Sequence, residues 1–163
     1  MRSGRHPIVL ALVAAVAAFA AGCGGGDAPA KSAAEPAHHH EHVPPHGGTA
    51  VELGEEQFHL ELVRDATAGK LTAYVMDGEL EKFIRISAPS FSVVAQVGGA
   101  AQTLVFQPVA NAATGEKPGD TSQIEAVADW LKTTPAFDAI LPELTVRGTA
   151  FKNVKFNYPK GNE

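Results

Sequence analysis

The feature that most constrains the fold is a series of short runs in which apolar and polar residues alternate. Residues 57–62 read QFHLEL, so that Phe58, Leu60 and Leu62 share one face of an extended chain. Glycine-containing turns such as 98–99 separate the runs, and such turns favour hairpins. The pattern predicts an all-β domain over residues 47–163, an antiparallel β-sandwich of seven or eight strands. The same two-residue period recurs in later runs, at 71–75, 84–86, 91–97, 104–106, 144–146 and 154–158.

One segment departs from the two-residue period. After the polar pair Thr121-Ser122, four apolar residues lie three and four positions apart: Ile124, Val127, Ala128 and Leu131. That spacing places them on one face of a helix. We therefore expect one short helix within residues 121–133.

The N-terminus has the layout of an export signal. Arg2, Arg5 and His6 precede an apolar run over residues 8–19, and small residues follow it. The apolar run is shorter than the roughly 20 residues that a helix needs to span a bilayer. We therefore expect residues 1–22 to be a signal peptide that is removed on export.

The end of this leader reads Ala20-Ala21-Gly22-Cys23, and Cys23 is the only cysteine in the chain. These residues resemble the lipobox of bacterial lipoproteins. The resemblance implies that the Cys23 thiol is lipidated, that the leader is cut before Cys23, and that acyl chains anchor the protein in the cell envelope. The alternative is an ordinary signal peptide, or a membrane helix, with an incidental cysteine. If the thiol is consumed by lipid, no disulfide is available and a hydrophobic core must stabilise the domain.

Position 24 bears on which membrane holds the anchor. Gly24 stands where an Asp would resemble the inner-membrane retention signal of Gram-negative lipoproteins. In such a host the resemblance implies the outer membrane, with the protein facing the periplasm.

The charge of the mature chain excludes one class of partner. Removal of residues 1–22 leaves 11 basic and 18 acidic residues, a net charge of −7. Phosphate backbones attract basic surfaces, so this balance argues against nucleic acid as a partner and against electrostatic docking on anionic lipid.

Residues 23–46 are expected to form a linker that carries a metal-binding segment. Its first part is rich in Gly, Ala and Pro, and its second part is rich in histidine. Neutral imidazole binds Zn, Ni and Cu(II), and a single methionine, Met76, beyond the leader argues against a thioether-rich Cu(I) site. The alternative is a solvated linker whose histidines bind nothing. The expected ligands are five histidines, with Glu41 as a weaker candidate: His38, His39, His40, His42 and His46.

Two further residues each allow two interpretations. His59 shares the polar face of its run with Glu61, so we expect it to face solvent; in the alternative it completes a metal site with His46. Trp130 is the only tryptophan, and it either anchors the core or binds a protein partner.

A second resemblance covers residues 46–78, which read HGGTAVELGEEQFHLELVRDATAGKLTAYVMDG. This stretch is similar to a group of small exported β-sandwich proteins, and related stretches occur beside or inside the periplasmic adaptor subunits of heavy-metal efflux pumps. The resemblance implies the fold, a His46 that opens the domain and faces metal, and a metal-efflux or envelope protein complex as a partner. It carries over no catalytic residues.

Motifs for catalysis are missing from the sequence, which has no Gly-x-Ser-x-Gly elbow, no His-Glu-x-x-His pair and no phosphate-binding glycine loop. The sequence therefore predicts a membrane-tethered binding module that is not an enzyme and that binds divalent metal through its histidines. The alternative is a structural or protein-interaction lipoprotein in which the histidines are incidental.

Overall fold

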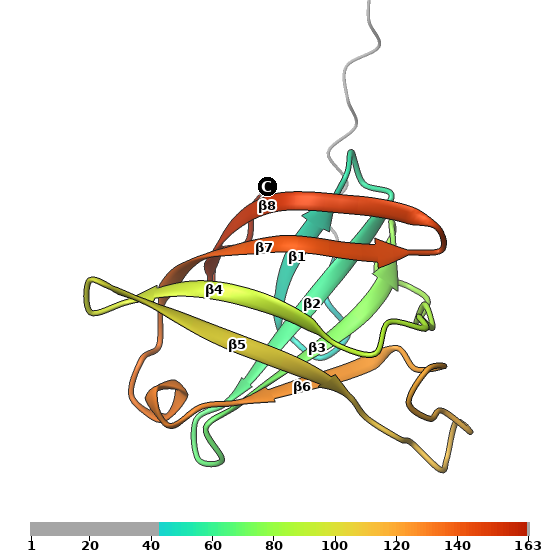
Figure 1. Ribbon diagram of the computed structural model, residues 1–163. Helices are drawn as coiled ribbons and strands as arrows, with labels where there is room; N and C mark the ends of the chain where they lie inside the picture. Colours follow the sequence, from blue (N-terminus) through green and yellow to red (C-terminus); the bar gives the residue numbers. More distant parts are fainter. Residues whose placement is uncertain (1–42, 163) are drawn as a thin grey trace, which may run out of the picture. The chain divides into compact units, whose positions relative to one another are not determined.

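The computed structural model describes residues 43–162, and this part of the chain is all-β (Figure 1). The only helical element in residues 43–162 is a 3-10 turn, η1 (Asp129–Lys132). Nothing helical in this range is long and apolar enough to cross a membrane. The predicted all-β class is confirmed. The eight strands, each antiparallel to its neighbours, are β1 (Thr49–Leu53), β2 (Phe58–Asp65), β3 (Lys70–Asp77), β4 (Phe91–Val97), β5 (Ala100–Pro108), β6 (Gln123–Val127), β7 (Phe137–Val146) and β8 (Thr149–Tyr158).

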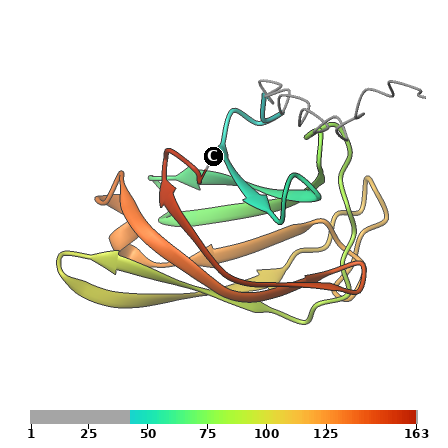
Figure 2. The same ribbon diagram turned by 90° about the horizontal axis from the view of Figure 1, so that it is seen from above.

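The strands form one continuous sheet, in the order β1-β2-β3-β6-β5-β4-β7-β8. The sheet curls, so that the β1–β2–β3 part faces the part that contains β7 and β8 (Figure 2). The two halves are joined by β5 and β6, which pair only at Gln107 with Glu125 and at Pro108 with Ile124. The two layers expected of a sandwich are therefore the two halves of a single, nearly closed sheet.

The end of the chain lies against the first strand. The side-chain amide of Asn162 accepts a hydrogen bond from the Glu52 backbone N–H at 2.8 Å and donates one to the Glu52 carbonyl at 3.2 Å. Gly161 has φ +83, and a Cβ there would collide with the carbonyl oxygen of Ala50. A side-chain amide thus takes the place of a neighbouring strand along part of the β1 edge.

The core lies between the two halves of the sheet, and the two-residue period identified most of it. Phe91 of β4 and Phe106 of β5 stack at 4.7 Å between ring centroids. Alternate residues of the predicted runs point inward and are buried: Leu60, Leu62, Leu71, Ala73, Val75, Val93, Ala95, Leu104, Leu144, Val146 and Phe156. Val51 of β1, a strand that the sequence did not predict, is buried with them.

The two strongest turn signals form two-residue hairpins. Gly98 and Gly99 link β4 to β5 with φ of 58° and 82°, and Arg147 and Gly148 link β7 to β8 with φ of 48° and 87°. Positive φ at both central residues is the geometry that matches the twist of paired strands. The hairpin predicted at residues 98–99 is confirmed.

The expected helix within residues 121–133 is wrong. Residues 123–127 form strand β6, in which Ile124 and Ala126 face the core and Val127 is 72% exposed. Leu131 is buried, but in the 3-10 turn. The apolar positions 124, 126 and 128 also have a two-residue period, and pairing with the open edge of β3 decided between the two periods.

Candidate functional site

A fully buried carboxylate organises the start of the domain. Glu61 lies in the middle of β2 and its side chain has no exposed surface. Its Oε1 accepts hydrogen bonds from the backbone N–H groups of His46 at 2.7 Å and Gly48 at 3.0 Å, and its Oε2 lies 2.7 Å from Nδ1 of His46. Three donors from one segment, residues 43–48, therefore compensate the desolvation of this carboxylate.

Gly48 allows that segment to approach β2 so closely. A Cβ at position 48 would stand 2.6 Å from the carbonyl oxygen of Leu62 and 2.8 Å from side-chain atoms of both Glu61 and Val63. No larger residue fits without displacing the segment or the strand.

The His46 ring is fixed on its flat side as well as at Nδ1. It stacks on the ring of Tyr74 in β3, with centroids 4.0 Å apart and an angle of 14° between planes. Phe83 lies 5.7 Å from the same ring in a tilted orientation. The side chain nevertheless keeps 37% of its surface exposed.

The contact with Glu61 determines which His46 nitrogen is available. An ionised carboxylate only accepts hydrogen bonds, so Nδ1 must carry the proton in this pair. In the neutral imidazole Nε2 is then the unprotonated nitrogen, and it makes no hydrogen bond within the described residues. An oriented, unprotonated imidazole nitrogen can bind a metal ion or accept a proton.

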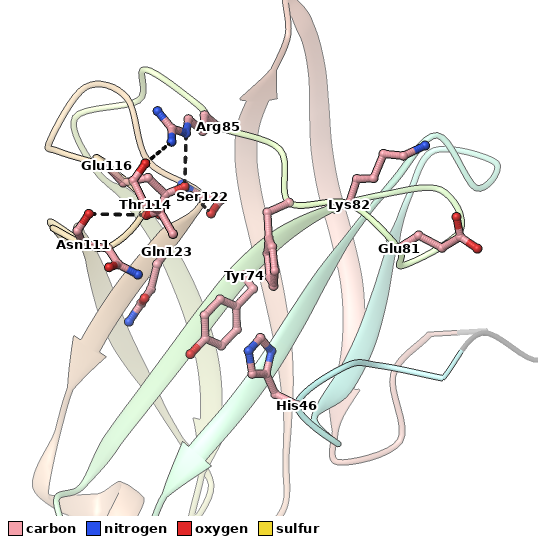
Figure 3. Close-up of a pocket in the computed structure, with 11 residues that line it drawn as sticks. His46, Tyr74, Glu81, Lys82, Arg85, Asn111, Thr114, Glu116, Ser122 and Gln123 are labelled. Carbon is pink, nitrogen blue, oxygen red and sulfur yellow. Dashed lines mark hydrogen bonds and ion pairs between the residues drawn. The ribbon is translucent and has the colours of Figure 1, made fainter.

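His46 stands at one end of a cleft of about 570 Å³ (Figure 3), which we call the His46 cleft. Its walls come from the leading segment, from β3, from the connection between β3 and β4, and from the connection between β5 and β6. Its lining residues are His46, Tyr74, Glu81, Lys82, Phe83, Arg85, Asn111, Thr114, Glu116, Ser122 and Gln123.

The wall opposite His46 is tied together by Arg85. Its guanidinium donates to the Thr114 carbonyl at 2.6 Å and forms ion pairs with Asp120 at 3.1 Å and with Glu116 at 3.4 Å. The buried Glu116 carboxylate also accepts hydrogen bonds from the backbone N–H and hydroxyl of Ser122. Both connections are thus fixed in place without a ligand.

Burial and the nearby carboxylates also affect the phenol of Tyr74. Partial burial raises the pKa of Tyr74 above its ordinary value, and the nearby carboxylates of Glu125 and Glu61 raise it further, while Lys70 opposes them. The hydroxyl is therefore a neutral hydrogen-bonding group at the floor of the cleft.

The structure locates only part of the predicted metal site. His46 is present with a defined orientation. Cys23, His38, His39, His40, Glu41 and His42 lie outside the described residues. Within residues 43–162, no three side chains of the His, Cys, Asp and Glu types come together to hold a metal ion.

His59 is not the solvent-facing residue that the alternation predicted. Both His59 and Glu61 are fully buried, as is Met76, which lies opposite His59 on β3. The Nδ1 atom of His59 is 3.3 Å from the carbonyl oxygen of Asp77. Alternation shows which residues share a face of a strand, but not which other segments cover that face.

Trp130 packs on the edge of the core. Its ring meets Phe137 edge-on at 5.2 Å, and Phe137 in turn stacks on Tyr158 at 5.3 Å. The side chain is half-buried, which favours core anchoring between the two predicted roles.

The sequence did not identify Glu61, Tyr74 and Phe83 as partners of His46. A hairpin between β1 and β2, with its turn at residues 54–57, places Ala50 opposite Glu61, and residue 48 is then two positions before Ala50, in the segment that covers Glu61. That register was the available signal. The contact with Phe83 carries no local signal, because it depends on how the β3–β4 connection folds back.

Comparisons with protein-family models, with curated proteins and with solved structures find no match for this chain. The function must therefore be argued from the site itself.

Replacing Glu61 by Gln tests the role of its carboxylate. Glu61 now accepts three hydrogen bonds, and the NH₂ group of a glutamine cannot accept the ones that reach its position. We therefore expect the free energy of unfolding to fall by about 1–3 kcal/mol. The matched control, E143Q, alters an exposed carboxylate 3.6 Å from Lys152 and should change stability by less than about 0.5 kcal/mol. Urea denaturation at neutral pH measures both. Equal effects in the two variants would show that Glu61 does not hold the leading segment.

Tyr74 makes stability depend on alkaline pH. Because its folded-state pKa is raised, the unfolded chain loses this proton first, and the contribution of Tyr74 falls as pH rises above about 10. We expect Y74F to lose less stability than the wild type between about pH 9 and about pH 11. Urea denaturation at both pH values gives the free energy of unfolding of each protein relative to its own value at pH 7. Equal losses in Y74F and the wild type would contradict the raised pKa of Tyr74.

Proposed function

We propose that this protein is a lipid-anchored, non-catalytic lipoprotein of the cell envelope that binds a divalent transition metal through His46 and the histidines that precede it. The observation that carries the proposal is the pairing of His46 Nδ1 with the buried Glu61 carboxylate. Metal-ligating histidines commonly donate their second ring N–H to a carboxylate, which fixes the tautomer and makes the ligating nitrogen more basic.

The remaining ligands must come from the chain before residue 43. The described residues supply one oriented imidazole and no cluster of three ligating side chains. Residues 38–42 lie outside the described residues, and His42, four positions before His46, belongs to the histidines nearest to His46 in the sequence. Imidazole ligands favour Zn, Ni or Cu(II).

This arrangement suits capture of metal better than catalysis. One ligand, His46, is fixed on the domain. The others belong to a stretch whose composition predicts a linker, and ordering a linker on binding lowers affinity. The lipid anchor is supported by the Ala20-Ala21-Gly22-Cys23 sequence, and a partner in a metal-efflux or envelope complex is supported by the resemblance of residues 46–78.

Zinc titration of the mature, detergent-solubilised lipoprotein against a competing indicator tests the metal site. We expect H46A to weaken binding by at least about 10-fold, and replacement of His38, His39, His40 and His42 by Asn to weaken it at least as much. The control E143Q removes an exposed carboxylate outside the cleft and should leave the Kd unchanged. A Kd in H46A equal to that of the wild type would refute the role of His46.

Mass spectrometry of the protein extracted from its native membrane tests the anchor. We expect the first residue to be Cys23, with a diacylglyceryl thioether that accounts for the added mass. C23S should accumulate with residues 1–22 still attached. An intact leader on the wild-type protein, or an unmodified Cys23, would contradict the proposed anchor and location.

A further inference from the structure

The His46 cleft has the size and rigidity of a binding site for a small molecule. Its volume of about 570 Å³ falls within the range of ligand pockets, roughly 300–1,000 Å³. The contacts of Arg85 with Thr114, Glu116 and Asp120 hold its outer wall in place, so that little ordering is needed on binding.

The charges that line the cleft cancel one another. Two carboxylates, Glu81 and Glu116, and two cations, Lys82 and Arg85, are among the lining residues. Arg85 and Glu116 are already paired with each other and with further protein groups. The formal charges of the lining therefore sum to zero, and this balance does not favour an ionic ligand of either sign.

An aromatic surface forms one side of the cleft. The rings of His46, Tyr74 and Phe83 contact one another, with Tyr74 and Phe83 centroids 5.9 Å apart. Phe83 is 48% exposed. A ligand that covers this ring would remove apolar surface from water and so gain binding free energy. Since the rings pack on each other, they offer a single face and leave no slot between two parallel rings.

Neutral polar groups complete the lining. The Asn111 amide accepts a hydrogen bond from Ala113 N–H, and the Gln123 amide donates one to Glu125. Within the described residues, the other end of each amide has no hydrogen-bond partner, and neither does the Tyr74 hydroxyl. Amides and a hydroxyl beside an apolar ring match a ligand that carries several hydroxyl groups.

We infer that the His46 cleft binds a neutral, polyhydroxylated ligand, a saccharide of one or two rings. The C–H face of a pyranose ring covers one side of Phe83, while its hydroxyl groups exchange hydrogen bonds with Asn111, Gln123 and Tyr74. A planar base also stacks on the face of a single ring, so adenosine serves as the competing ligand in the test. The inference uses different side chains from those proposed to bind metal, apart from His46 as part of the wall.

Saturation-transfer NMR on the mature lipoprotein tests this inference with three neutral disaccharides: cellobiose, maltose and N,N′-diacetylchitobiose. We expect at least one of them to bind with a Kd of about 1 mM or tighter. F83A and Q123A should each weaken that binding at least about 10-fold, a loss of about 1.4 kcal/mol. The matched controls V105A and Q107A, at exposed residues of β5 outside the cleft, should leave it unchanged.

The same variants separate this site from the metal site. Q123A should keep the zinc affinity of the wild type, because Gln123 donates to Glu125 and does not contact His46. The saccharide inference can therefore fail while metal binding stands, and metal binding can fail while the saccharide inference stands. The inference is overturned if none of the three disaccharides binds, or if binding survives in both F83A and Q123A. It is also overturned if adenosine or glucose 6-phosphate binds the cleft more tightly than the neutral sugars do.

Discussion

The rest of the site depends on the burial of one carboxylate. Glu61 is removed from solvent in the middle of a strand, where an unpaired charge would cost several kcal/mol. His46 and Gly48 provide the compensating donors. Residues 46–48, which precede β1, are therefore held against the side of β2 that carries Glu61. This contact fixes the position of the His46 imidazole.

The order of the strands determines which side chains lie beside Glu61 and His46. Glu61 lies opposite Tyr74 on β3, and Tyr74 lies opposite Gln123 on β6, so one row across three strands supplies a carboxylate, a phenol and an amide. Two long connections, fastened together by Arg85, then build a wall beside this row. The fixed imidazole packs against this row of strand residues, and the two connections complete the cleft beside it. The two proposed activities therefore share one framework but use different principal side chains.

The sequence predicted most of the fold because one property, the two-residue period, determines both strand identity and the inward face. It failed at residues 124–131, where two periods coincide and only the partner strand decides. Of the site, the sequence singled out His46 alone, from its place in the histidine-rich segment and from the resemblance of residues 46–78. Glu61 was assigned to a solvated face, because nothing local shows that residues 46–48 cover it. Contacts between segments that are distant in the chain are set by tertiary packing, which periodicity does not encode.

The tautomer of His46 tests the central claim most directly, and long-range ¹H–¹⁵N NMR of the metal-free protein at neutral pH reports it. The account predicts that Nδ1 carries the proton, donated to Glu61, and that Nε2 is unprotonated. It also predicts that the Nε2 resonance, rather than Nδ1, shifts when Zn²⁺ is added. A proton on Nε2, or rapid averaging of the two tautomers as in a free histidine, would contradict the claim that Glu61 holds this imidazole ready for a ligand.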